Sequence, residues 1–294
     1  MDPQKLEWQS KLILLAVAPW LLIATVFATR EWGQVAPEVP YWVLGLSALL
    51  GLLAWLARSG TAAASETGAL ITASLMFSTT QFPYNPFRTA LTPLLTVLVL
   101  TTLATRFGRH RKERFGTAER RQGRNAAQVA ANLGVAALVS LFSVQMGLAD
   151  GHLFRPLPWA PLAIFIPAMA ALAEAAADTL ASELGQVLGG TPFMMTTMRR
   201  VEPGTDGGIT VAGTLAGVAA AGLVAAAGIF ALGEGFAMQA VIWAAGVFGL
   251  FFDSLLGATL ERKGWLNNDG VNFISTASAA AFALLILAML PHAG

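Results

Sequence analysis

Long apolar runs recur along the whole chain and are separated by short polar segments. Each run has roughly the 17–25 residues that an α-helix needs to cross the hydrocarbon core of a bilayer. The third run is the weakest, because it is short and carries Glu66 among several serines and threonines, so eight spans are the alternative to nine. The pattern predicts an all-α, polytopic transmembrane helical bundle of about nine spans, at residues 11–29, 41–57, 62–80, 90–106, 126–148, 158–185, 209–232, 236–259 and 272–290.

The amino-acid composition agrees with a membrane protein. Hydrophobic residues make up 55% of the 294 positions and charged residues only 12%, against about 25% charged residues in soluble domains. The mean hydropathy is +0.63, and no linker is long enough to separate soluble domains. We therefore expect residues 1–294 to form a single integral membrane domain. The chain has no cysteine, which excludes disulfides, thiolate metal sites and cysteine nucleophiles.

The basic residues predict the orientation of the bundle. Between Arg106 and Arg124 lie eight of the eighteen Lys and Arg residues, and such a loop is cytoplasmic by the positive-inside rule. The loops with Arg199 and with Arg262 each follow two spans later, so all three polar loops are expected on the cytoplasmic side, where they can converge. With nine spans the N-terminus is also cytoplasmic. We expect a bacterial-type cell membrane, with the active site facing the cytoplasm.

The basic loop has two compatible interpretations. It can anchor the topology and hold anionic lipid head groups. It can also recognise phosphate, because Lys and Arg supply point-charge and bidentate contacts to phosphate oxygens. Lys112 and Arg124 are the cations we select from it. Asn132 continues a polar stripe into the following span.

Besides the third run with Glu66, two apolar runs carry carboxylates, which are costly at membrane depth. Glu174 and Asp178 lie one helical turn apart in the sixth run, which also carries Glu183 and contains no basic residue. Asp253 lies near the cytoplasmic end of the eighth run, at the same expected depth. Such groups can serve only as polar contacts between helices. Carboxylates without protein cations more often bind a metal, and hard oxygen ligands select Mg²⁺, so the acids predict a magnesium site.

The segment between the sixth and seventh runs is rich in Gly and Thr and ends in GTDGGIT. Gly207 and Gly208 permit backbone conformations that other residues avoid. Thr205 or Asp206 can cap the helix that begins near Ile209. A glycine-rich approach to a helix N-terminus can cradle phosphate, although an ordinary capped turn would look the same. There is no GxxxxGK[ST] sequence, so the chain is not a P-loop enzyme.

Several short motifs occur in a fixed order: ADTLASELG, TP…TT…V…GTDGGIT, DSLLGAT and NNDGVN, preceded by FG…K…R…QV.AN. Together they resemble the motifs of a membrane family represented by plant and cyanobacterial phytyl-phosphate kinases, to which animal transmembrane protein 19 also belongs. The resemblance covers about residues 90–290. The family is distantly similar to phytol kinase, dolichol kinase and the CDP-diacylglycerol synthase group, membrane enzymes that use CTP or related nucleotides with Mg²⁺.

The resemblance implies a membrane-embedded isoprenyl-phosphate kinase. It would transfer the γ-phosphoryl group of CTP or another nucleoside triphosphate to phytyl or polyprenyl monophosphate, with Mg²⁺, to give the diphosphate. A phosphate monoester has a second pKa of about 6, so it attacks without a general base, which an alcohol would need. We expect the Ala/Gly-rich spans 209–232 and 236–259 to open a lateral groove for the prenyl tail.

The residues and the resemblance together give a hypothesis for the site. The catalytic side chains are Asp178, Asp253, Lys112 and Arg124. The metal ligands are Asp178, Glu183, Asp206 and Asp253. Nucleotide or phosphate contacts come from Thr196, Thr197, Arg199, Thr205, Gly207, Gly208, Asn268, Asn272 and Asn132.

Other functions fit the same sequence. A prenol (phytol-like) kinase would phosphorylate an alcohol, and a cytidylyltransferase making a CDP-linked lipid would release pyrophosphate. A transporter of a lipid phosphate would also place charged groups in broken helices, but here the polar motifs gather at one face. The expected partners are an isoprenoid lipid phosphate and the lipid bilayer, with no nucleic acid, and a homodimer is left open.

Overall fold

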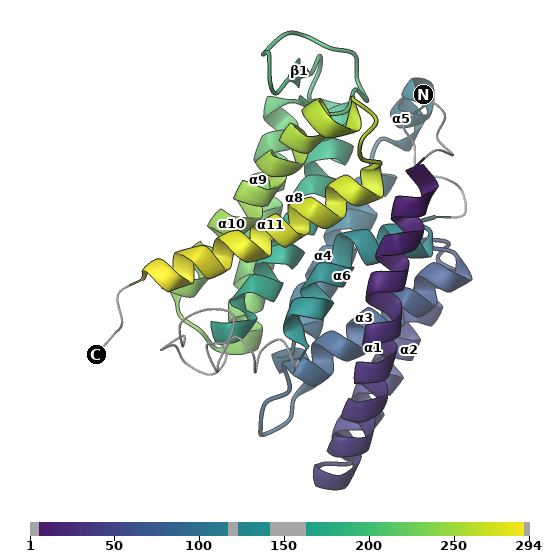
Figure 1. Cartoon of the computed structure of the whole chain (residues 1–294), viewed down its shortest axis with the longest axis vertical. Helices are drawn as coiled ribbons and strands as arrows, with labels where there is room; N and C mark the ends of the chain where they lie inside the picture. Colours follow the sequence, from purple (N-terminus) through teal and green to yellow (C-terminus); the bar gives the residue numbers. More distant parts are fainter. Residues whose placement is uncertain (1–5, 117–122, 142–162, 291–294) are drawn as a thin grey trace.

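The computed structural model describes residues 6–116, 123–141 and 163–290, and these are almost entirely helical (Figure 1). Each predicted apolar run overlaps one long helix. Residues 142–148 of the fifth run and 158–162 of the sixth lie outside the described residues. The long helices are α1 (Glu7–Val35), α2 (Glu38–Leu56), α3 (Ala62–Ser78), α4 (Leu91–Arg106), α6 (Ala126–Ser140), α8 (Ile166–Leu188), α9 (Val211–Leu232), α10 (Phe236–Leu256) and α11 (Asn268–Met289). The structure also contains a short helix, α5 (Arg109–Phe115), a two-stranded hairpin, β1 (Phe193–Met194) with β2 (Gly208–Ile209), and short 3-10 and π-helical turns.

Five of these helices are long and apolar enough to cross a membrane: α1, α2, α9, α11, and α10 together with the π-helical turn that continues it to Glu261. Helices α4 and α6 are apolar but shorter. The predicted class, a helical integral membrane protein, is therefore confirmed. The number of spans, about nine, stays a prediction.

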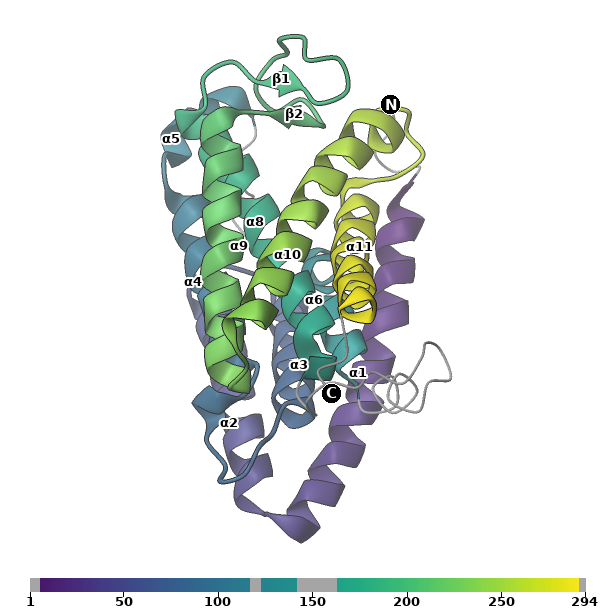
Figure 2. The same cartoon turned by 90° about the vertical axis from the view of Figure 1, so that its left-hand side faces the viewer.

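Helix α8 lies at the centre of the bundle. It packs against α4, α6, α9, α10 and α11, and every residue from Ile166 to Ala177 is buried. Its small alanine side chains allow the neighbouring backbones to approach closely. In Figure 2, α9 and α10 run alongside α8 on one side of the bundle.

Most glycines of α9 and α10 pack against α8. A Cβ atom at Gly213 would lie 2.4 Å from the carbonyl oxygen of Ala181, and one at Gly217 would lie 2.7 Å from that of Ala177. The expectation that these two spans open a lateral groove for a lipid tail therefore gains no support from these contacts and stays a prediction. Their small residues are used for close helix packing, a role that the composition alone also allowed.

Helices α1, α2 and α3 form a second group beside α6. Polar contacts tie the start of α1 to the turn before α11. The side chain of Gln9 donates a hydrogen bond to the Trp265 carbonyl at 2.8 Å, Asn267 donates to the Leu6 carbonyl at 2.9 Å, and Ser10 donates to Asp269 at 2.6 Å. These contacts fix the position at which α11 begins.

The predicted polar loops gather at one end of the bundle. The start of α1, helix α5, the β1–β2 hairpin and the turn between α10 and α11 all lie at the top in Figures 1 and 2. From there α11 runs obliquely across the bundle (Figure 1). The convergence of the three loops is thus present, and its assignment to the cytoplasmic side stays a prediction.

Candidate active site

A polar cavity of about 370 Å³ opens at the end where the loops gather. Its walls come from α6, α8, the segment before α9, the end of α10 and the start of α11. The predicted site residues that line it are Arg124, Asn132, Asp178, Glu183, Thr205, Asp206, Gly207, Gly208, Asp253, Asn268 and Asn272. We call this space the acidic cavity.

Two carboxylates from different helices meet in the acidic cavity. Asp178 of α8 and Asp253 of α10 both line it and act electrostatically on each other, and the guanidinium group of Arg124 acts electrostatically on Asp178. One oxygen of Asp253, Oδ2, is buried and has no hydrogen-bond partner among the described residues. A buried carboxylate oxygen without a partner is expensive, so it marks a position that a cation can fill.

Glu174 lies below the cavity, one turn before Asp178. Its side chain is 1% exposed, and it does not line the cavity. A Cβ atom at Gly249 would lie 2.4 Å from its Cγ, so α10 approaches α8 closely at this point. The acid that first stands out in the sequence therefore supports the cavity floor.

The glycine-rich loop is held over the end of α10. Gly207 has a φ of 72°, a left-handed conformation that favours glycine. A Cβ atom there would lie 2.3 Å from the backbone nitrogen of Ala258. Burial raises the pKa of Asp206 beside it, and the nearby Arg262 guanidinium offsets part of this rise. The loop thus brings a further carboxyl group to the cavity.

The π-helical turn, Gly257–Glu261, places an acid that the sequence hypothesis missed. Glu261 lines the cavity. Its signal was present, because Asp253, Gly257 and Glu261 follow one another at intervals of four residues, which share a helix face. Insertions of this π type are frequent at functional sites.

Three helices begin at the acidic cavity. Gln128 of α6, Thr210 before α9 and Asn268 of α11 all line it, and each lies within the first turn of its helix or at its N-cap. The first four backbone N–H groups of an α-helix have no partner within the helix. The N-cap side chains of Asn125, Thr210 and Asn267 each accept a hydrogen bond from one of them. Helix N-termini carry partial positive charge and favour bound anions.

Amide side chains form the wall between α6 and α11. Asn132 donates a hydrogen bond to the Gln128 carbonyl at 2.8 Å, and Asn272 donates to the side-chain oxygen of Asn132 at 3.5 Å. The amide of Gln128 itself closes a capping box, because it accepts the backbone N–H of Asn125 at 2.8 Å. This wall supplies uncharged polar groups facing the acids of α8 and α10.

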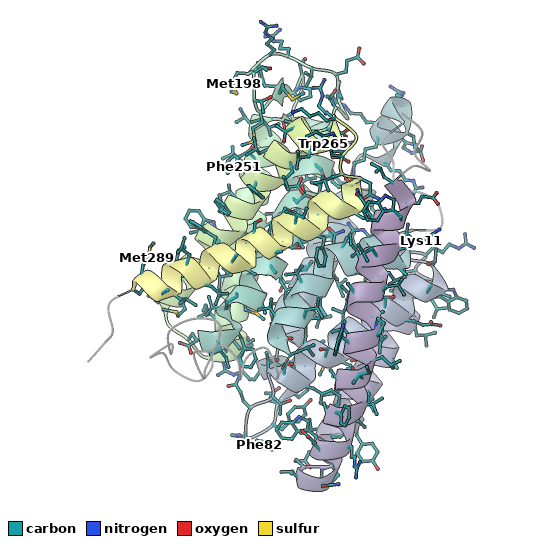
Figure 3. All side chains as sticks on the ribbon, viewed as in Figure 1. Lys11, Phe82, Met198, Phe251, Trp265 and Met289 are labelled. Carbon is teal, nitrogen blue, oxygen red and sulfur yellow. The ribbon has the colours of Figure 1, made fainter. Side chains whose placement is uncertain are left out.

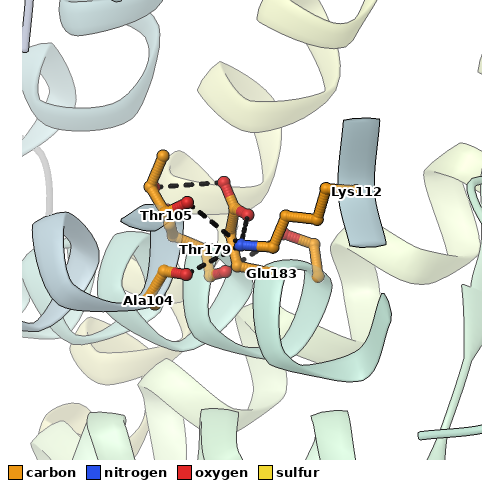
Figure 4. Close-up of polar contacts among 6 residues, drawn as sticks. Ala104, Thr105, Lys112, Thr179 and Glu183 are labelled. Atoms are coloured by element: carbon orange, nitrogen blue, oxygen red, sulfur yellow. Dashed lines mark hydrogen bonds and ion pairs between the residues drawn. The ribbon is translucent and has the colours of Figure 1, made fainter. Parts of the chain in front are cut away.

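Lys112 does not enter the cavity. Its side chain is 1% exposed, and its Nζ lies 2.5 Å from Oε2 of Glu183 (Figure 4). The ammonium group also donates to the carbonyls of Ala104 at 2.8 Å and Thr105 at 3.2 Å, and the Thr105 hydroxyl donates to Glu183 at 3.1 Å. The lysine is thus enclosed between α4, α5 and α8, where it closes the polar end of α4. The structure gives no support to Lys112 as a phosphate ligand or to Glu183 as a free metal ligand.

The tip of the β1–β2 hairpin lies outside the cavity. Thr196, Thr197 and Arg199 are exposed and are not among its lining residues. Figure 3 shows their neighbour Met198 at the side of this hairpin, beyond the ends of the helices. The hairpin folds on itself, since the Met194 N–H donates to the Arg199 carbonyl at 2.8 Å. These three predicted contacts are therefore not brought to the site.

The four predicted metal ligands do not form one cluster. Within the described parts of the chain, no group of three or more His, Asp or Glu side chains is arranged to hold a metal ion. Magnesium, however, is commonly bound by one or two carboxylates together with water and substrate phosphates. Asp178 and Asp253, with the unpartnered oxygen of Asp253, fit that kind of site. The donor set suits a metal–nucleotide complex better than a cage built only of protein ligands.

Residues 45–280 match the family model described as integral membrane protein DUF92. The chain belongs to this family. The matched range contains every residue that lines the acidic cavity. The resemblance to the group of phytyl-phosphate kinases and transmembrane protein 19 is confirmed at the level of the family.

Three relatives illustrate the similarity. The chain is 41% identical to an uncharacterised membrane protein of Methanocaldococcus jannaschii over 152 residues, which are 49% of this chain and 62% of that protein. It is 32% identical to an uncharacterised membrane protein of Synechocystis sp. over 195 residues, 65% of this chain and 71% of that protein. It is 31% identical to the chloroplastic protein VTE6 of Arabidopsis thaliana over 196 residues, 64% of this chain and 55% of that protein. No solved structure matches.

Proposed function

We propose that the protein is a membrane-embedded prenyl-phosphate kinase. It transfers the γ-phosphoryl group of CTP or another nucleoside triphosphate to a prenyl monophosphate, such as phytyl phosphate, and makes the diphosphate. The observation that carries the proposal is the Asp178–Asp253 pair, with its unpartnered carboxylate oxygen, in a cavity where three helices begin. The family resemblance to phytyl-phosphate kinases supports the same reaction.

The charges of the cavity suit a metal-bound polyphosphate. Asp178 and Asp253 would hold Mg²⁺, which neutralises phosphate charge when bound. The starts of α6, α9 and α11 supply partial positive charge to the phosphate oxygens, and Arg124 supplies a full charge at the edge of the cavity. Phosphoryl transfer depends mainly on such positioning and charge stabilisation.

The acceptor needs no base from the protein. An oxygen of the acceptor monophosphate forms a bond to the γ-phosphorus while the bond from that phosphorus to the β,γ-bridging oxygen breaks, and a nucleoside diphosphate leaves. The monophosphate is largely a dianion at neutral pH, because its second pKa is about 6. No histidine is among the residues that line the acidic cavity in the described chain, which is consistent with a phosphate acceptor.

The orientation is part of the proposal. The cavity opens at the end that carries helix α5 and Arg124, and we place this end at the cytoplasmic surface by the positive-inside rule. The nucleotide would then enter from the cytoplasm. Labelling of a single introduced cysteine at Arg199 from either side of intact cells tests this, since the chain has no other cysteine.

Product analysis tests the reaction. The purified protein is incubated with Mg²⁺, each nucleoside triphosphate, and phytol, farnesol, phytyl phosphate or farnesyl phosphate. Prenyl diphosphate together with a nucleoside diphosphate is the expected result. A monophosphate made from the alcohol would instead identify a prenol kinase, and a CDP-linked lipid with pyrophosphate would identify a cytidylyltransferase. Absence of any product, with lipid phosphate moved across vesicles, would replace the kinase with a transporter.

A further inference from the structure

A second cavity, of about 660 Å³, lies between α2, α3, α4, α5 and α6. This volume is within the range of roughly 300–1,000 Å³ that ligand pockets occupy. Its mouth contains residues of the basic loop, including Arg124, and it does not include the paired acids of α8 and α10. We call it the basic cavity, for the residues at its mouth.

The mouth of the basic cavity is cationic. Four arginines and one histidine line it against a single acid, Glu113. That acid is bound to Arg109 at 3.1 Å and lies 3.6 Å from His110. The cationic side chains are Arg58, Arg106, Arg109, Arg124 and His110. Arginine forks match the oxygens of a phosphate group in bidentate geometry.

The deeper part of the basic cavity is mostly apolar, and the hydroxyl groups of Thr72 and Thr101 that line it donate to carbonyls of their own helices. Leu94 and Leu98 of α4 face Val129 and Leu133 of α6 across it, and Gly68 of α3 leaves room between them. From Arg106 at the mouth to Leu94 is twelve residues of helix, about 18 Å at 1.5 Å per residue. That depth is more than half of the ~30 Å hydrocarbon core of a bilayer. The space is therefore shaped for a molecule with an anionic head and a long apolar tail.

Arg124 joins the two cavities, because it lines both. Its backbone is clamped against the turn between α2 and α3: its N–H donates to the Ser59 carbonyl, and its carbonyl accepts from Thr61, both at 3.0 Å. The wall beside it is thin, since Thr105 of the basic cavity donates a hydrogen bond to Glu183 of the acidic cavity at 3.1 Å. A phosphate held at the mouth thus lies next to the acidic cavity.

We infer that the basic cavity is the acceptor site, which holds the prenyl monophosphate with its phosphate at Arg124 and its tail between α3, α4 and α6. The inference rests on the proposed function for the identity of the tail and head. It leaves the acidic cavity to the metal and the nucleotide. Arg124, at the junction, contacts the acceptor phosphate and sets it beside the γ-phosphoryl group.

Photoaffinity labelling tests the position of the tail without requiring turnover. The probe is a farnesyl monophosphate analogue with a diazirine at the end of the chain, applied to the purified protein in detergent. We expect labelled peptides from α3, α4 and α6, and we expect unlabelled farnesyl monophosphate to displace the probe. Labelling confined to α9 and α10, or no displaceable labelling, overturns the inference.

Competition experiments test whether the cavity prefers a prenyl monophosphate over free phosphate or a bilayer phospholipid. Inorganic phosphate and phosphatidylglycerol are each added at the concentration at which farnesyl monophosphate displaces the probe. Neither is expected to displace it, because the first lacks the tail and the second has two bulky chains. Equal displacement by phosphatidylglycerol would make the cavity a site for bilayer lipid and overturn the inference.

Gly68→Leu is the matched steric test. A Cβ atom at Gly68 meets only Val129, at 4.0 Å, so the backbone accepts a side chain while the leucine fills the cavity. We expect displaceable labelling to fall by about tenfold, a change worth ~1.4 kcal/mol in binding. Gly45→Leu is the control, because Gly45 is exposed on α2 with nothing within 4 Å of its Cβ position. Parent-like labelling of Gly68→Leu contradicts the inference.

The head group is tested by a pair of probes. The double variant that carries Arg58→Gln and Arg106→Gln is expected to show weaker labelling by the monophosphate probe. Its labelling by the corresponding alcohol probe is expected to stay unchanged. Equal weakening of both would contradict recognition of phosphate at the mouth. Labelling in the basic cavity without kinase activity would refute the proposed function alone, and activity with labelling elsewhere would refute the inference alone.

Discussion

The two cavities lie side by side and carry opposite charge. Five carboxylates and one arginine line the acidic cavity, whereas four arginines and one glutamate line the basic cavity. A cleft with charge of one sign concentrates ligands of the other sign. The first arrangement favours a metal ion that brings polyphosphate, and the second favours a phosphate monoester directly. Under the proposed function, the difference would let one small bundle hold two anionic substrates, one through a metal and one through guanidinium groups.

The largest expected effect on turnover comes from the two carboxylates proposed to bind the metal. Asp178→Asn and Asp253→Asn each remove a charge from the acidic cavity, and we expect kcat to fall by on the order of 10³-fold, comparable with one charge contact in phosphoryl transfer. Labelling of the basic cavity by the prenyl monophosphate probe should persist, because its lining does not include either acid. Steady-state kinetics over a range of Mg²⁺ concentrations measures the first effect.

Asp269→Asn is the control for these variants. Asp269 is bound to Ser10 at 2.6 Å and lines neither cavity, so asparagine can keep the contact. Its turnover should match that of the parent. Near-normal turnover in both Asp178→Asn and Asp253→Asn, in folded protein, would refute the metal assignment and with it the contrast between the cavities.

The next effect is on the wall between the cavities. Glu183→Gln leaves the buried ammonium group of Lys112 without its counter-charge, which costs about 3 kcal/mol of folding free energy. The double variant Lys112→Met with Glu183→Gln removes both charges and should recover most of that loss. Thermal unfolding in detergent compares the three proteins. If the single variant is as stable as the parent while turnover collapses, Glu183 acts in catalysis instead.

A smaller effect is expected at the glycine loop. Gly207→Ala adds strain of about 1–2 kcal/mol for a left-handed residue and a clash with the backbone of Ala258. We expect the nucleotide KM to rise by roughly tenfold, because the loop closes the acidic cavity. Gly233→Ala is the control: its φ is 74°, but nothing lies within 4 Å of the Cβ position. Equal effects of the two substitutions would show that strain alone matters.

The smallest effect is expected at the hairpin tip. Arg199→Gln changes an exposed side chain outside both cavities. Such surface substitutions usually change free energies by less than about 0.5 kcal/mol, so the kinetic constants should stay within about twofold of the parent. A large loss of nucleotide affinity would mean that the hairpin folds over the acidic cavity when substrate binds.

Much of the acidic cavity was predictable from local pattern. Asp178 and Asp253 stand out because charge inside an apolar run is costly, and Gly207 stands out because loops that approach a helix closely need glycine. The missed Glu261 follows the same four-residue spacing as Asp253 and Gly257. Each of these signals lies within a few residues of sequence, so reading one segment at a time can find it.

The sequence by itself determined the class of the protein, the position of its helices and most of the acidic cavity, because hydrophobic periodicity and costly charges are local properties. Only the tertiary structure decided the partner of Lys112, which lies 71 residues away along the chain at Glu183. It also decided that most glycines of α9 and α10 pack on α8, and that a cavity remains among helices α2 to α6. A cavity is the volume that several helices leave unfilled, and that volume depends on side chains from all of them at once.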